Sequence, residues 1–354
     1  MTNQYIEHAL KLAKKARPSP NPRVGAVIVK NGKIIGEGFH AKFGGDHAEI
    51  AAIKSVKNKE ELKGAALYVT LEPCSHYEKT PPCTSAIIEA GLKEVIIGCR
   101  DKNPKVNSVS ELKKKGIEAK ILEDEECNKM NESFFHWIKT RKPFVMLKLA
   151  MTLDGRIATK TGDSKYISNA QSRALSNSWR SEYDAIMVGI NTVLVDNPRL
   201  TSRKSGTENP IRIIVDSYLK APVGHNWIEP NARRIIATSA KHDKEKRKKL
   251  EKEGVEVLVL PETSEGHIDL KVLLEKLGEI GITSILVEGG SELATTMLES
   301  GLINKIAIFI SCQILGNGIN LFEGKGVEKM KDAWHLKAIA IKQVQDDVLI
   351  EGYV

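Results

Sequence analysis

Residues 47–50 read HAEI, and residues 71–83 read LEPCSHYEKTPPC. Together they supply one histidine and two cysteines, His47, Cys74 and Cys83, in an order that is typical of a metal site. One nitrogen and two sulfur ligands suit Zn²⁺ and leave a fourth position for water, which is the arrangement of a catalytic zinc site. Glu49 follows His47 at the predicted start of a helix, where it can face that water without binding the metal. We therefore predict a zinc-dependent hydrolytic deaminase in which Glu49 moves the protons.

The spacing of the two cysteines is unusual. Eight residues separate Cys74 from Cys83, whereas the common deaminase pattern has two. The insert contains His76 and Lys79, and a cation beside the metal suits an anionic substrate. In the alternative interpretation His47 caps or packs a helix and the cysteines are buried thiols, but the ordered set of motifs argues against it. A site with two cysteines and one histidine can also accept Fe²⁺ or Co²⁺.

Hydrophobic periodicity outward from these motifs predicts alternating strands and helices, and hence an α/β fold. For the first part we predict strands at 24–30, 33–38, 66–71, 95–99 and 118–121, and helices at 2–17, 47–55, 84–90 and 108–115. A closing helix is predicted over 123–141. For the second part we predict strands at 144–150, 185–189, 211–216, 234–238, 255–260, 284–288 and 305–311, and helices at 169–181, 244–253, 270–280 and 291–300. With Lys142-Pro143 as the boundary, the predicted domains are residues 1–143 and 144–354.

Composition limits the class of protein. A chain of 354 residues favours two domains. No apolar run is long enough to span a membrane, and the N-terminus has helical periodicity rather than a signal-peptide pattern, so we expect a cytoplasmic protein. Five scattered cysteines do not suggest a disulfide framework. The net charge of +8 fits nucleic-acid binding, a lysine-rich solvated surface or an anionic substrate, and net charge by itself does not separate these.

The chain resembles a known family, the bifunctional riboflavin-biosynthesis deaminase–reductases. The segments that carry the resemblance are PNPRVGAVIV (20–29), GFH (38–40), HAEI (47–50), LEPCSHYEKTPPC (71–83) and DKNPKV (101–106). The resemblance continues through the second domain and covers nearly the whole chain. It implies an N-terminal cytidine-deaminase-like α/β/α sandwich and a C-terminal dihydrofolate-reductase-like α/β domain.

For the first domain the resemblance implies a substrate, 2,5-diamino-6-(5-phosphoribosylamino)pyrimidin-4-one. It implies that four residues hold the pyrimidine and the ribose phosphate: Asn21, His40, His76 and Lys79. Alternatively, Asn21 shapes a turn between two prolines and His76 is an exposed loop residue. Two departures from the family pattern stand out. Glu78 replaces a glycine, and residues 107–110 (NSVS) replace a glycine-containing turn, which survives if Asn107 takes the left-handed conformation.

The second domain lacks the G-x-G-x-x-G fingerprint of a Rossmann fold. It contains VEGGSEL (287–293) instead, where a predicted strand passes through two glycines into a helix. Free N–H groups at such a helix start bind phosphate or pyrophosphate, although a Gly-Gly turn is also often purely structural. The segments KLAMTLDGR (148–156), TGDSKYI (161–167), VGINTVLVDNPRLT (188–201) and IRIIVDS (211–217) resemble the reductase domain of the same family.

This resemblance implies NADPH as hydride donor to the ribose C1 of the deaminated product. The implied cofactor-binding residues are Met151, Tyr166, Thr192, Asp196, Ser217, Gly290, Ser291, Glu292, Leu293, Ala294, Thr295 and Thr296. The implied substrate-binding residues are Ser164, Arg180, Leu200, Arg203 and Glu288, with the two arginines as phosphate clamps. We expect Asp196 and Lys148 to be the catalytic polar groups nearest the opening sugar. In the structural alternatives Asp196 caps a turn and Arg180 is a surface helix residue.

The leading hypothesis is therefore a bifunctional enzyme of riboflavin biosynthesis that uses Zn²⁺ and NADPH on phosphoribosylated pyrimidines. We expect a homo-oligomer without nucleic-acid or membrane partners. One alternative is an RNA-editing or nucleobase deaminase, which the absence of interleaved aromatic and basic residues opposes. A second alternative is a deaminase with an inactive reductase domain, which the presence of Asp196, Arg180 and Arg203 opposes.

Overall fold

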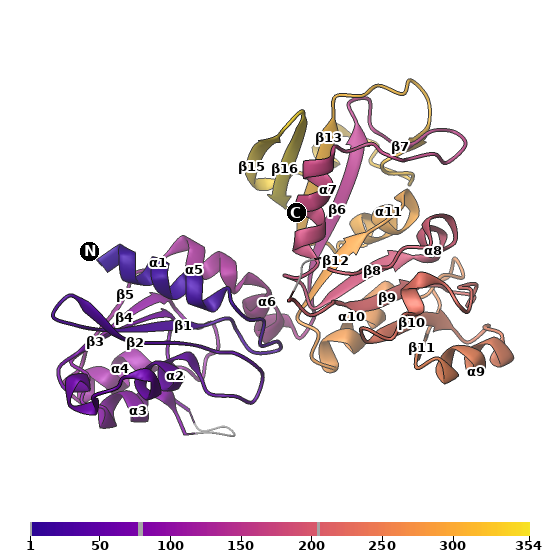
Figure 1. Ribbon diagram of the computed structural model, residues 1–354. Helices are drawn as coiled ribbons and strands as arrows, with labels where there is room; N and C mark the ends of the chain where they lie inside the picture. Colours follow the sequence, from indigo (N-terminus) through magenta and orange to yellow (C-terminus); the bar gives the residue numbers. More distant parts are fainter. Residues whose placement is uncertain (1, 77–80, 204–205) are drawn as a thin grey trace. The chain divides into compact units, whose positions relative to one another are not determined.

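Two units make up the chain, Met1–Arg141 and Lys142–Val354 (Figure 1). The computed structural model describes residues 2–76, 81–203 and 206–354. Each unit has its own sheet and hydrophobic core, and each is described separately below. Every helix within these described ranges is too short or too polar to cross a bilayer.

The first unit is built on a five-stranded sheet in the order β2-β1-β3-β4-β5. The strands are β1 (Gly25–Lys30), β2 (Lys33–Phe39), β3 (Ala66–Leu71), β4 (Glu94–Cys99) and β5 (Glu118–Ile121). β1 pairs antiparallel with β2 and β3, and β3, β4 and β5 run parallel. Asn31 and Gly32 both have positive φ, 50° and 74°, as a two-residue hairpin turn requires. The predicted strands are therefore present, with ends that differ by a residue.

Helices cover both faces of this sheet (Figure 1). They are α1 (Thr2–Ala13), α2 (Ala48–Ser55), α3 (Cys83–Glu89), α4 (Ser108–Lys114), α5 (Glu125–Met130), α6 (Glu132–Thr140) and the 3₁₀ turn η1 (Lys59–Leu62). In Figure 1, α1 and α5 lie on one side of the sheet, and α2, α3 and α4 lie on the other. This is the α/β/α sandwich that the family resemblance implies.

The prediction of one closing helix over 123–141 was wrong, because two helices meet at Asn131. The Asn131 side chain accepts a hydrogen bond from the Arg23 backbone N–H at 2.9 Å and donates one to the Arg23 carbonyl at 3.0 Å. Asn131 is only 2% exposed, so its amide needs these partners. Asn131 thus separates α5 from α6 while it is bonded to Arg23, which lies 108 residues earlier in the chain.

The second unit contains a nine-stranded sheet in the order β11-β10-β9-β8-β12-β6-β13-β16-β15. Its strands are β6 (Phe144–Thr152), β8 (Ala185–Gly189), β9 (Ile211–Val215), β10 (Arg234–Ser239), β11 (Glu256–Leu260), β12 (Ser284–Glu288), β13 (Lys305–Ser311), β15 (Lys337–Val344) and β16 (Asp347–Tyr353). The seven strands from β11 to β13 in this order are parallel, and β13, β16 and β15 are antiparallel neighbours. A separate pair joins β7 (Arg156–Ala158) to β14 (Ile319–Asn320).

The helices of this unit are α7 (Ala170–Trp179), α8 (Ile190–Asp196), α9 (Lys244–Lys252), α10 (Leu270–Glu279) and α11 (Ser291–Glu299), with 3₁₀ turns η2 (Asn226–Ile228) and η3 (Met330–Asp332). Helix α8 was not predicted, because its β-branched residues have low helix propensity. No strand was predicted after residue 311, so β15 and β16 are known only from the structure. The other predicted helices are present but end slightly earlier.

Parallel strands bring distant residues to one edge of this sheet. Gly189 ends β8, Ser217 follows β9, and Glu288 ends β12. β12 lies between β8 and β6, in register from Ser284–Glu288 to the first part of β6. In open α/β sheets ligands bind outside the carboxyl ends of the strands. The fold therefore predicts a ligand-binding site at this edge.

Candidate active sites

Three predicted metal ligands meet in the first unit. His47 is the N-cap of α2, Cys74 follows β3, and Cys83 is the first residue of α3. His47 Nδ1 lies 3.2 Å from Cys83 Sγ and 3.6 Å from Cys74 Sγ, and all three ligand atoms lie within 4.8 Å of one another. Tetrahedral zinc bonds of about 2.0–2.1 Å to nitrogen and about 2.3 Å to sulfur would place such atoms about 3.6 Å apart. The observed separations are close to this value, so the three side chains fit zinc with only small shifts.

The thiols are prepared for a metal. Hydrogen bonding from Cys83 lowers the pKa of Cys74 to about 4, against the opposing effect of burial and with further help from His47. Because they share that hydrogen bond, the pKa of Cys83 is raised. The Cys83 backbone N–H also donates to Cys74 Sγ at 3.3 Å. The thiolate is the form of cysteine that binds metals. When a cation binds, the pair therefore needs to release only its one remaining proton.

Glu49 lies in the first turn of α2, beside the ligands. It is 3% exposed, and its carboxyl group hydrogen-bonds the Cys83 side chain. Burial, and then the negative charge of Cys74, raise the pKa of Glu49 to about 7. A carboxyl group with a pKa near neutrality can both accept and donate a proton at physiological pH.

Asn21 and His40 meet beside the metal ligands. Asn21 Nδ2 and His40 Nε2 are 3.0 Å apart, and the His40 ring lies edge-on to the His47 ring at 5.2 Å between centroids. His40 Nδ1 is 2.9 Å from the Asp46 carbonyl, so Nδ1 carries the proton and Nε2 accepts from Asn21. Burial lowers the pKa of His40. A neutral imidazole and an amide oxygen therefore stand next to the metal-binding group.

The insert between the cysteines is described only in part. His76 lies near Asp101, whose carboxyl group it influences electrostatically. Lys79 and Glu78 lie outside the described residues. Asn107 has φ −146° and does not use the left-handed region considered for it; its N–H donates to Ser75 Oγ at 2.8 Å. The turn after residue 106 is thus held by a hydrogen bond to the insert.

In the second unit, α8 and α11 begin side by side. Their N-caps, Gly189 and Gly290, provide no side-chain cap. Gly289 has φ +139°, and a Cβ there would lie 3.0 Å from Thr192 Oγ1. The Ser291 hydroxyl is buried without a hydrogen-bond partner among the described residues. Two uncapped helix starts, a close glycine and an unsatisfied hydroxyl make a cradle that fits the pyrophosphate of a dinucleotide.

The other residues predicted to bind the cofactor lie on several different segments of the unit. Ser217 Oγ accepts a hydrogen bond from the Ile268 N–H at 3.2 Å, next to the end of β9. Met151 lies near the end of β6 and packs on the main core of the unit. Tyr166 is 64% exposed and stacks with the Arg173 guanidinium at 4.1 Å, at a surface cavity of about 460 Å³. Ser164 precedes it in the same loop, where its carbonyl accepts from the Ile167 N–H.

Along α11, the remaining predicted cofactor residues have varied contacts. The Glu292 carboxylate accepts a hydrogen bond from Asn191 Nδ2 at 3.0 Å, which joins the first turns of α11 and α8. Thr295 Oγ1 accepts from the Glu323 N–H, and Thr296 Oγ1 donates to the Glu292 carbonyl. Leu293 and Ala294 are buried in the core. The cradle is thus formed by the start of α11 rather than by its whole length.

Arg180 and Glu288 form a partly buried ion pair. Arg180 Nε and Nη2 donate to the two Glu288 oxygens at 3.0 and 2.7 Å, and the side chains are 11% and 13% exposed. Arg180 Nη1 also donates to the Thr201 carbonyl at 3.2 Å. The guanidinium predicted to be a phosphate clamp is thus engaged with protein groups on all three nitrogens.

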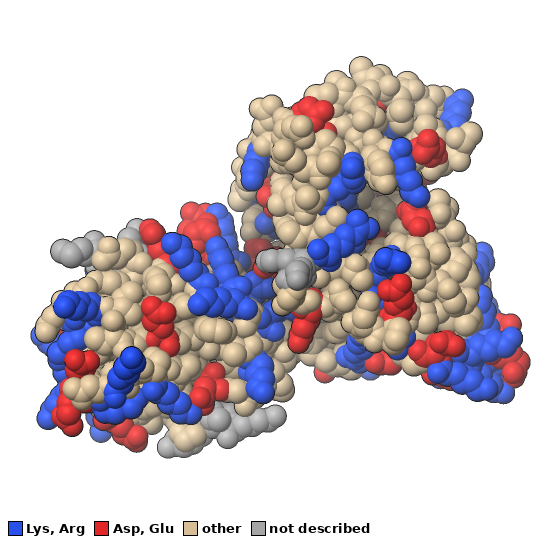
Figure 2. All heavy atoms as spheres, viewed as in Figure 1, with Lys and Arg blue, Asp and Glu red and all other residues tan. Residues whose placement is uncertain are grey.

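Lys148 and Arg203 influence the same carboxylate. Burial opposes ionisation of Glu288, but Arg180, Lys148 and Arg203 outweigh it, and the pKa of Glu288 is lowered. Burial lowers the pKa of Lys148, against the attraction of Glu288. A lysine with a lowered pKa next to a carboxylate can exchange a proton with a substrate. Figure 2 shows lysine and arginine side chains gathered beside a hollow on this unit, as an anionic substrate requires.

Asp196 is the last residue of α8 and is exposed. Asn197 ends the helix in the left-handed conformation, with φ 41°. The loop that follows leads through the buried Leu200 to Arg203. Asp196, predicted to bind the cofactor, thus ends α8, and Leu200 and Arg203, predicted to bind substrate, lie on the loop directly after it.

Comparison with known proteins assigns both units. The RibD C-terminal domain matches residues 143–350, and the zinc-binding region of cytidine and deoxycytidylate deaminases matches residues 1–99. The riboflavin biosynthesis protein RibD of Actinobacillus pleuropneumoniae is 42% identical over 99% of this chain and 94% of its own. The chain belongs to the RibD family. The RibD of Aquifex aeolicus is 40% identical over 98% of this chain and 96% of its own.

Solved RibD structures have the same architecture. A deaminase/reductase from Thermotoga maritima, named for diaminohydroxyphosphoribosylaminopyrimidine and 5-amino-6-(5-phosphoribosylamino)uracil, superposes with a TM-score of 0.88 at 39% identity, covering 99% of this chain and 98% of its own. RibD from Acinetobacter baumannii gives 0.85 at 32% identity, with the same coverage. The protein is therefore a bifunctional deaminase–reductase of riboflavin biosynthesis. Its cofactors are zinc and NADPH.

Two acids beside the RibD metal ligands escaped the sequence analysis. Glu72 is 4% exposed, with one oxygen bonded to Ser108 Oγ at 3.0 Å and the other without a hydrogen-bond partner among the described residues. Burial, and then Glu72, raise the pKa of Asp101 to about 6, although a backbone hydrogen bond opposes this. The parallel register of Leu71 with Cys99 places both acids at one sheet edge. A prediction of strand pairing, rather than of motifs, would have identified them.

Proposed function

We propose that residues 1–143 deaminate 2,5-diamino-6-(5-phosphoribosylamino)pyrimidin-4-one. Residues 144–354 would then reduce the ribosyl group of the product, 5-amino-6-(5-phosphoribosylamino)uracil, to ribityl. The observation that carries the proposal is the buried Glu49 bonded to Cys83 within the cluster of His47, Cys74 and Cys83. The names of the related enzymes supply the substrate class.

In the deaminase site, His47, Cys74 and Cys83 would hold the metal. When bound, zinc supplies the Lewis acidity that makes water a nucleophile near neutral pH. Glu49 would take a proton from the attacking water and return it to the amino group, which leaves as ammonia. Asn21 and His40 would hold the pyrimidine edge, because they are hydrogen-bonded to each other beside His47. His76 and Lys79 would hold the ribose phosphate.

In the reductase site, the starts of α8 and α11 would bind the cofactor, together with Met151, Tyr166 and Ser217. When bound, NADPH supplies the hydride that reaches the sugar C1. We assign Lys148 and Asp196 to the proton transfers that accompany ring opening. Ser164, Leu200 and Arg203 would contact substrate, while Arg180 would act mainly through Glu288, since its guanidinium is bonded to that carboxylate.

The assay that tests this function follows both products by mass spectrometry, with and without NADPH. We expect the deaminated ribosyl compound without NADPH and the ribityl compound only with it. Glu49→Gln should lower deamination by at least a hundredfold, because the amide cannot take a proton, and should leave reduction of supplied uracil substrate unchanged. Removal of zinc by a chelator should have the same selective effect, and added zinc should restore deamination.

An unchanged diaminopyrimidinone with zinc-loaded protein would contradict the substrate assignment. Deamination of a free nucleobase or of RNA would then support the alternative functions. Loss of both activities in Glu49→Gln would instead indicate a folding defect, which circular dichroism of the variant would detect.

We further propose that the partners are small phosphoribosylated pyrimidines rather than nucleic acid or membrane. The densest basic run forms α9, where Arg247 and Lys248 pair with Glu251 and Glu245 at 2.8 Å, so part of its charge is neutralised. Binding to RNA that weakens steeply with salt would contradict this. We also place the protein in the cytoplasm, because its five cysteines are free, and cell fractionation tests this.

We propose, finally, that the enzyme is a homo-oligomer associating through β15. This strand is the edge of the nine-stranded sheet, and one of its sides pairs with no other strand in the part of the chain that the structure describes. Ile339 and Ile341 on it are 57% and 70% exposed. Exposed edge strands with apolar side chains pair readily with another chain. The second copy would cover these residues.

A further inference from the structure

The loop from Asn197 to Arg203 has an unfavourable backbone. Asn197, Leu200 and Arg203 all have positive φ, 41°, 53° and 54°. The left-handed region is disfavoured for residues with a Cβ, most strongly for bulky ones such as leucine and arginine. Such conformations persist only where surrounding contacts hold them, and they cluster at functional sites. The contacts that hold this loop are therefore of functional interest.

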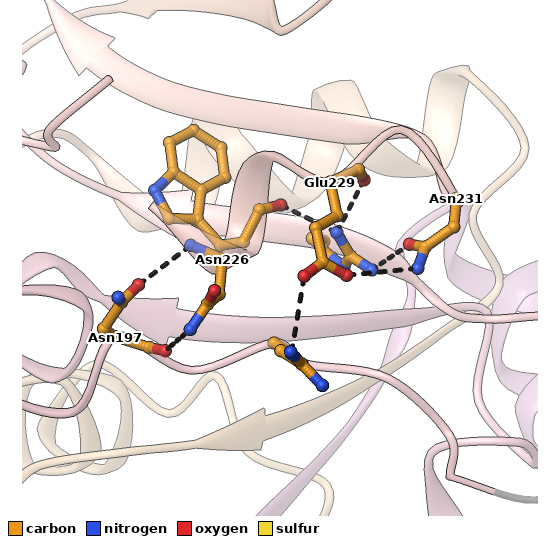
Figure 3. A network of polar contacts seen from close by, with 7 residues as sticks. Asn197, Asn226, Glu229 and Asn231 are labelled. Atoms are coloured by element: carbon orange, nitrogen blue, oxygen red, sulfur yellow. Dashed lines mark hydrogen bonds and ion pairs between the residues drawn. The ribbon is translucent and has the colours of Figure 1, made fainter. Parts of the chain in front are cut away.

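The start of the loop is held by a reciprocal pair of asparagines. The Asn226 backbone N–H donates to Asn197 Oδ1 at 2.8 Å, and Asn226 Nδ2 donates to the Asn197 carbonyl at 2.9 Å. Figure 3 shows the two side chains lying against each other's backbone. The Asn197 carbonyl lies just beyond α8, where the last carbonyls of a helix lack partners within the helix. Asn226 thus satisfies a group directly after Asp196.

The segment that carries Asn226 is itself anchored. Arg212 on β9 is fully buried and donates to the carbonyls of Trp227 and Glu229 at 2.8 and 2.9 Å, and to Asn231 Oδ1. Trp227 is also fully buried. A buried guanidinium is costly unless it is hydrogen-bonded, so these contacts tie residues 226–231 to the sheet. Figure 3 shows Glu229 and Asn231 along this segment.

The same segment reaches the loop at a second point. Glu229 Oε1 lies 3.4 Å from Arg199 Nε, and both side chains are partly or largely exposed. Farther along the loop, Arg180 bonds the Thr201 carbonyl. Asn226 therefore fixes the end nearest Asp196, and Arg180 fixes the end nearest Arg203.

We propose that Asn226 is a positioning residue of the reductase site. Held by Arg212 through the sheet, it fixes the left-handed turn at Asn197 and thereby directs Asp196 toward the reacting groups. The assignment rests on the proposed role of Asp196. Small displacements of a catalytic group reduce rates strongly, which is why a contact without access to the substrate affects turnover.

The test uses Asn226→Asp and Asn226→Ala in the full chain. Asparagine and aspartate have the same shape, but the carboxylate cannot donate to the Asn197 carbonyl and repels it. We expect kcat/KM of the reductase to fall about tenfold or more in both variants, most in Asn226→Asp. Deamination by the same molecules should stay within about twofold, which serves as an internal control of concentration and folding of the first unit.

A matched control is Arg233→Gln. It removes two hydrogen bonds to Glu256, at 2.7 and 2.8 Å, from the same sheet without touching the loop. We expect its reductase kcat/KM to remain within about twofold of the parent. Thermal unfolding of all variants shows whether the second unit remains folded.

A double-mutant cycle with Asp196→Asn separates positioning from general stability. If Asn226 acts through Asp196, adding Asn226→Ala to Asp196→Asn causes little further loss. If the double variant loses kcat/KM by the product of the two single losses, or if Asn226→Asp keeps full activity, the proposal is overturned. The role of Asp196 remains intact in both cases. Full activity of Asp196→Asn would show that the proposed role of Asp196 is wrong, and the assignment of Asn226 would be overturned with it.

Discussion

At the scale of single residues, the second unit repeats one interaction in two settings. Arg180 binds Glu288 through two hydrogen bonds, and Arg233 binds Glu256 in the same way. The first pair is 11% and 13% exposed, whereas the second is 39% and 46% exposed. Charged hydrogen bonds contribute more where water is excluded, and removal of one partner then leaves a desolvated charge. Loss of the buried Arg180–Glu288 pair should therefore cost more stability than loss of the exposed Arg233–Glu256 pair.

We predict that Glu288→Gln destabilises the second unit by about 2 kcal/mol at neutral pH, because Arg180 loses its counter-charge. The matched variant Glu256→Gln should cost less than about 1 kcal/mol, since its pair is solvated. Urea unfolding of both variants and the parent provides the comparison. Equal losses in the two variants would contradict the importance that we give to burial.

The same pair predicts a pH dependence. The pKa of Glu288 is lowered in the fold, so its stabilisation is present above the unfolded value of about 4.3 and is lost as pH falls through the folded pKa. Between pH about 4.3 and the lower folded value, the parent should therefore lose more unfolding free energy than Glu288→Gln. If the free energy of unfolding changed with pH in the same way in both proteins, this contribution of Glu288 would be excluded.

At the scale of elements, the metal site depends on how closely α2 approaches β2. A Cβ at Gly38 would lie 2.3 Å from the Ala52 backbone nitrogen and 2.4 Å from the Ala48 carbonyl oxygen. Only glycine allows this contact, and α2 carries Glu49 and is capped by His47. The position of these two functional groups is therefore set by a residue without a side chain.

We predict that Gly38→Ala displaces α2, costs about 1–3 kcal/mol in the first unit and weakens zinc retention. Zinc content by metal analysis and the deaminase rate should both fall, while the reductase rate is retained. Gly45→Ala is the control for a milder contact, because the added Cβ would lie 3.1 Å from the Lys42 carbonyl oxygen and a shift of a few tenths of an ångström relieves it. Full zinc content in Gly38→Ala would show that the helix can adjust.

At the scale of the whole molecule, the proposed oligomer gives a prediction of mass. Light scattering of the purified chain should give a multiple of 39.1 kDa. Ile341→Lys should lower that mass by placing a charge in the interface. Ile34→Lys is the control, since Ile34 is 39% exposed on β2 of the first unit. A monomeric parent protein, or an unchanged mass in Ile341→Lys, would exclude association through β15.

What the sequence by itself determined is local. Hydrophobic periodicity predicted most strands, and the short motifs around His47 and Cys74 predicted a three-ligand cluster that the structure brings together. The strands could be predicted because their signal lies in neighbours within a few residues. The cluster could be predicted because each of its short motifs is typical of a zinc deaminase, although its ligands lie up to 36 residues apart in the chain. The family and the two activities followed from the same motifs and from the second domain, and the comparisons confirm them.

The tertiary structure alone decided the contacts between distant segments. Arg23 divides a predicted single helix at Asn131, and Glu288 engages an arginine predicted to bind phosphate. Asn226 holds the turn after Asp196 from 29 residues away. Such pairs leave no periodic signal, because their partners are set by strand order and register in the sheet. A side chain's type was therefore readable from the sequence, but the group it would bind was not.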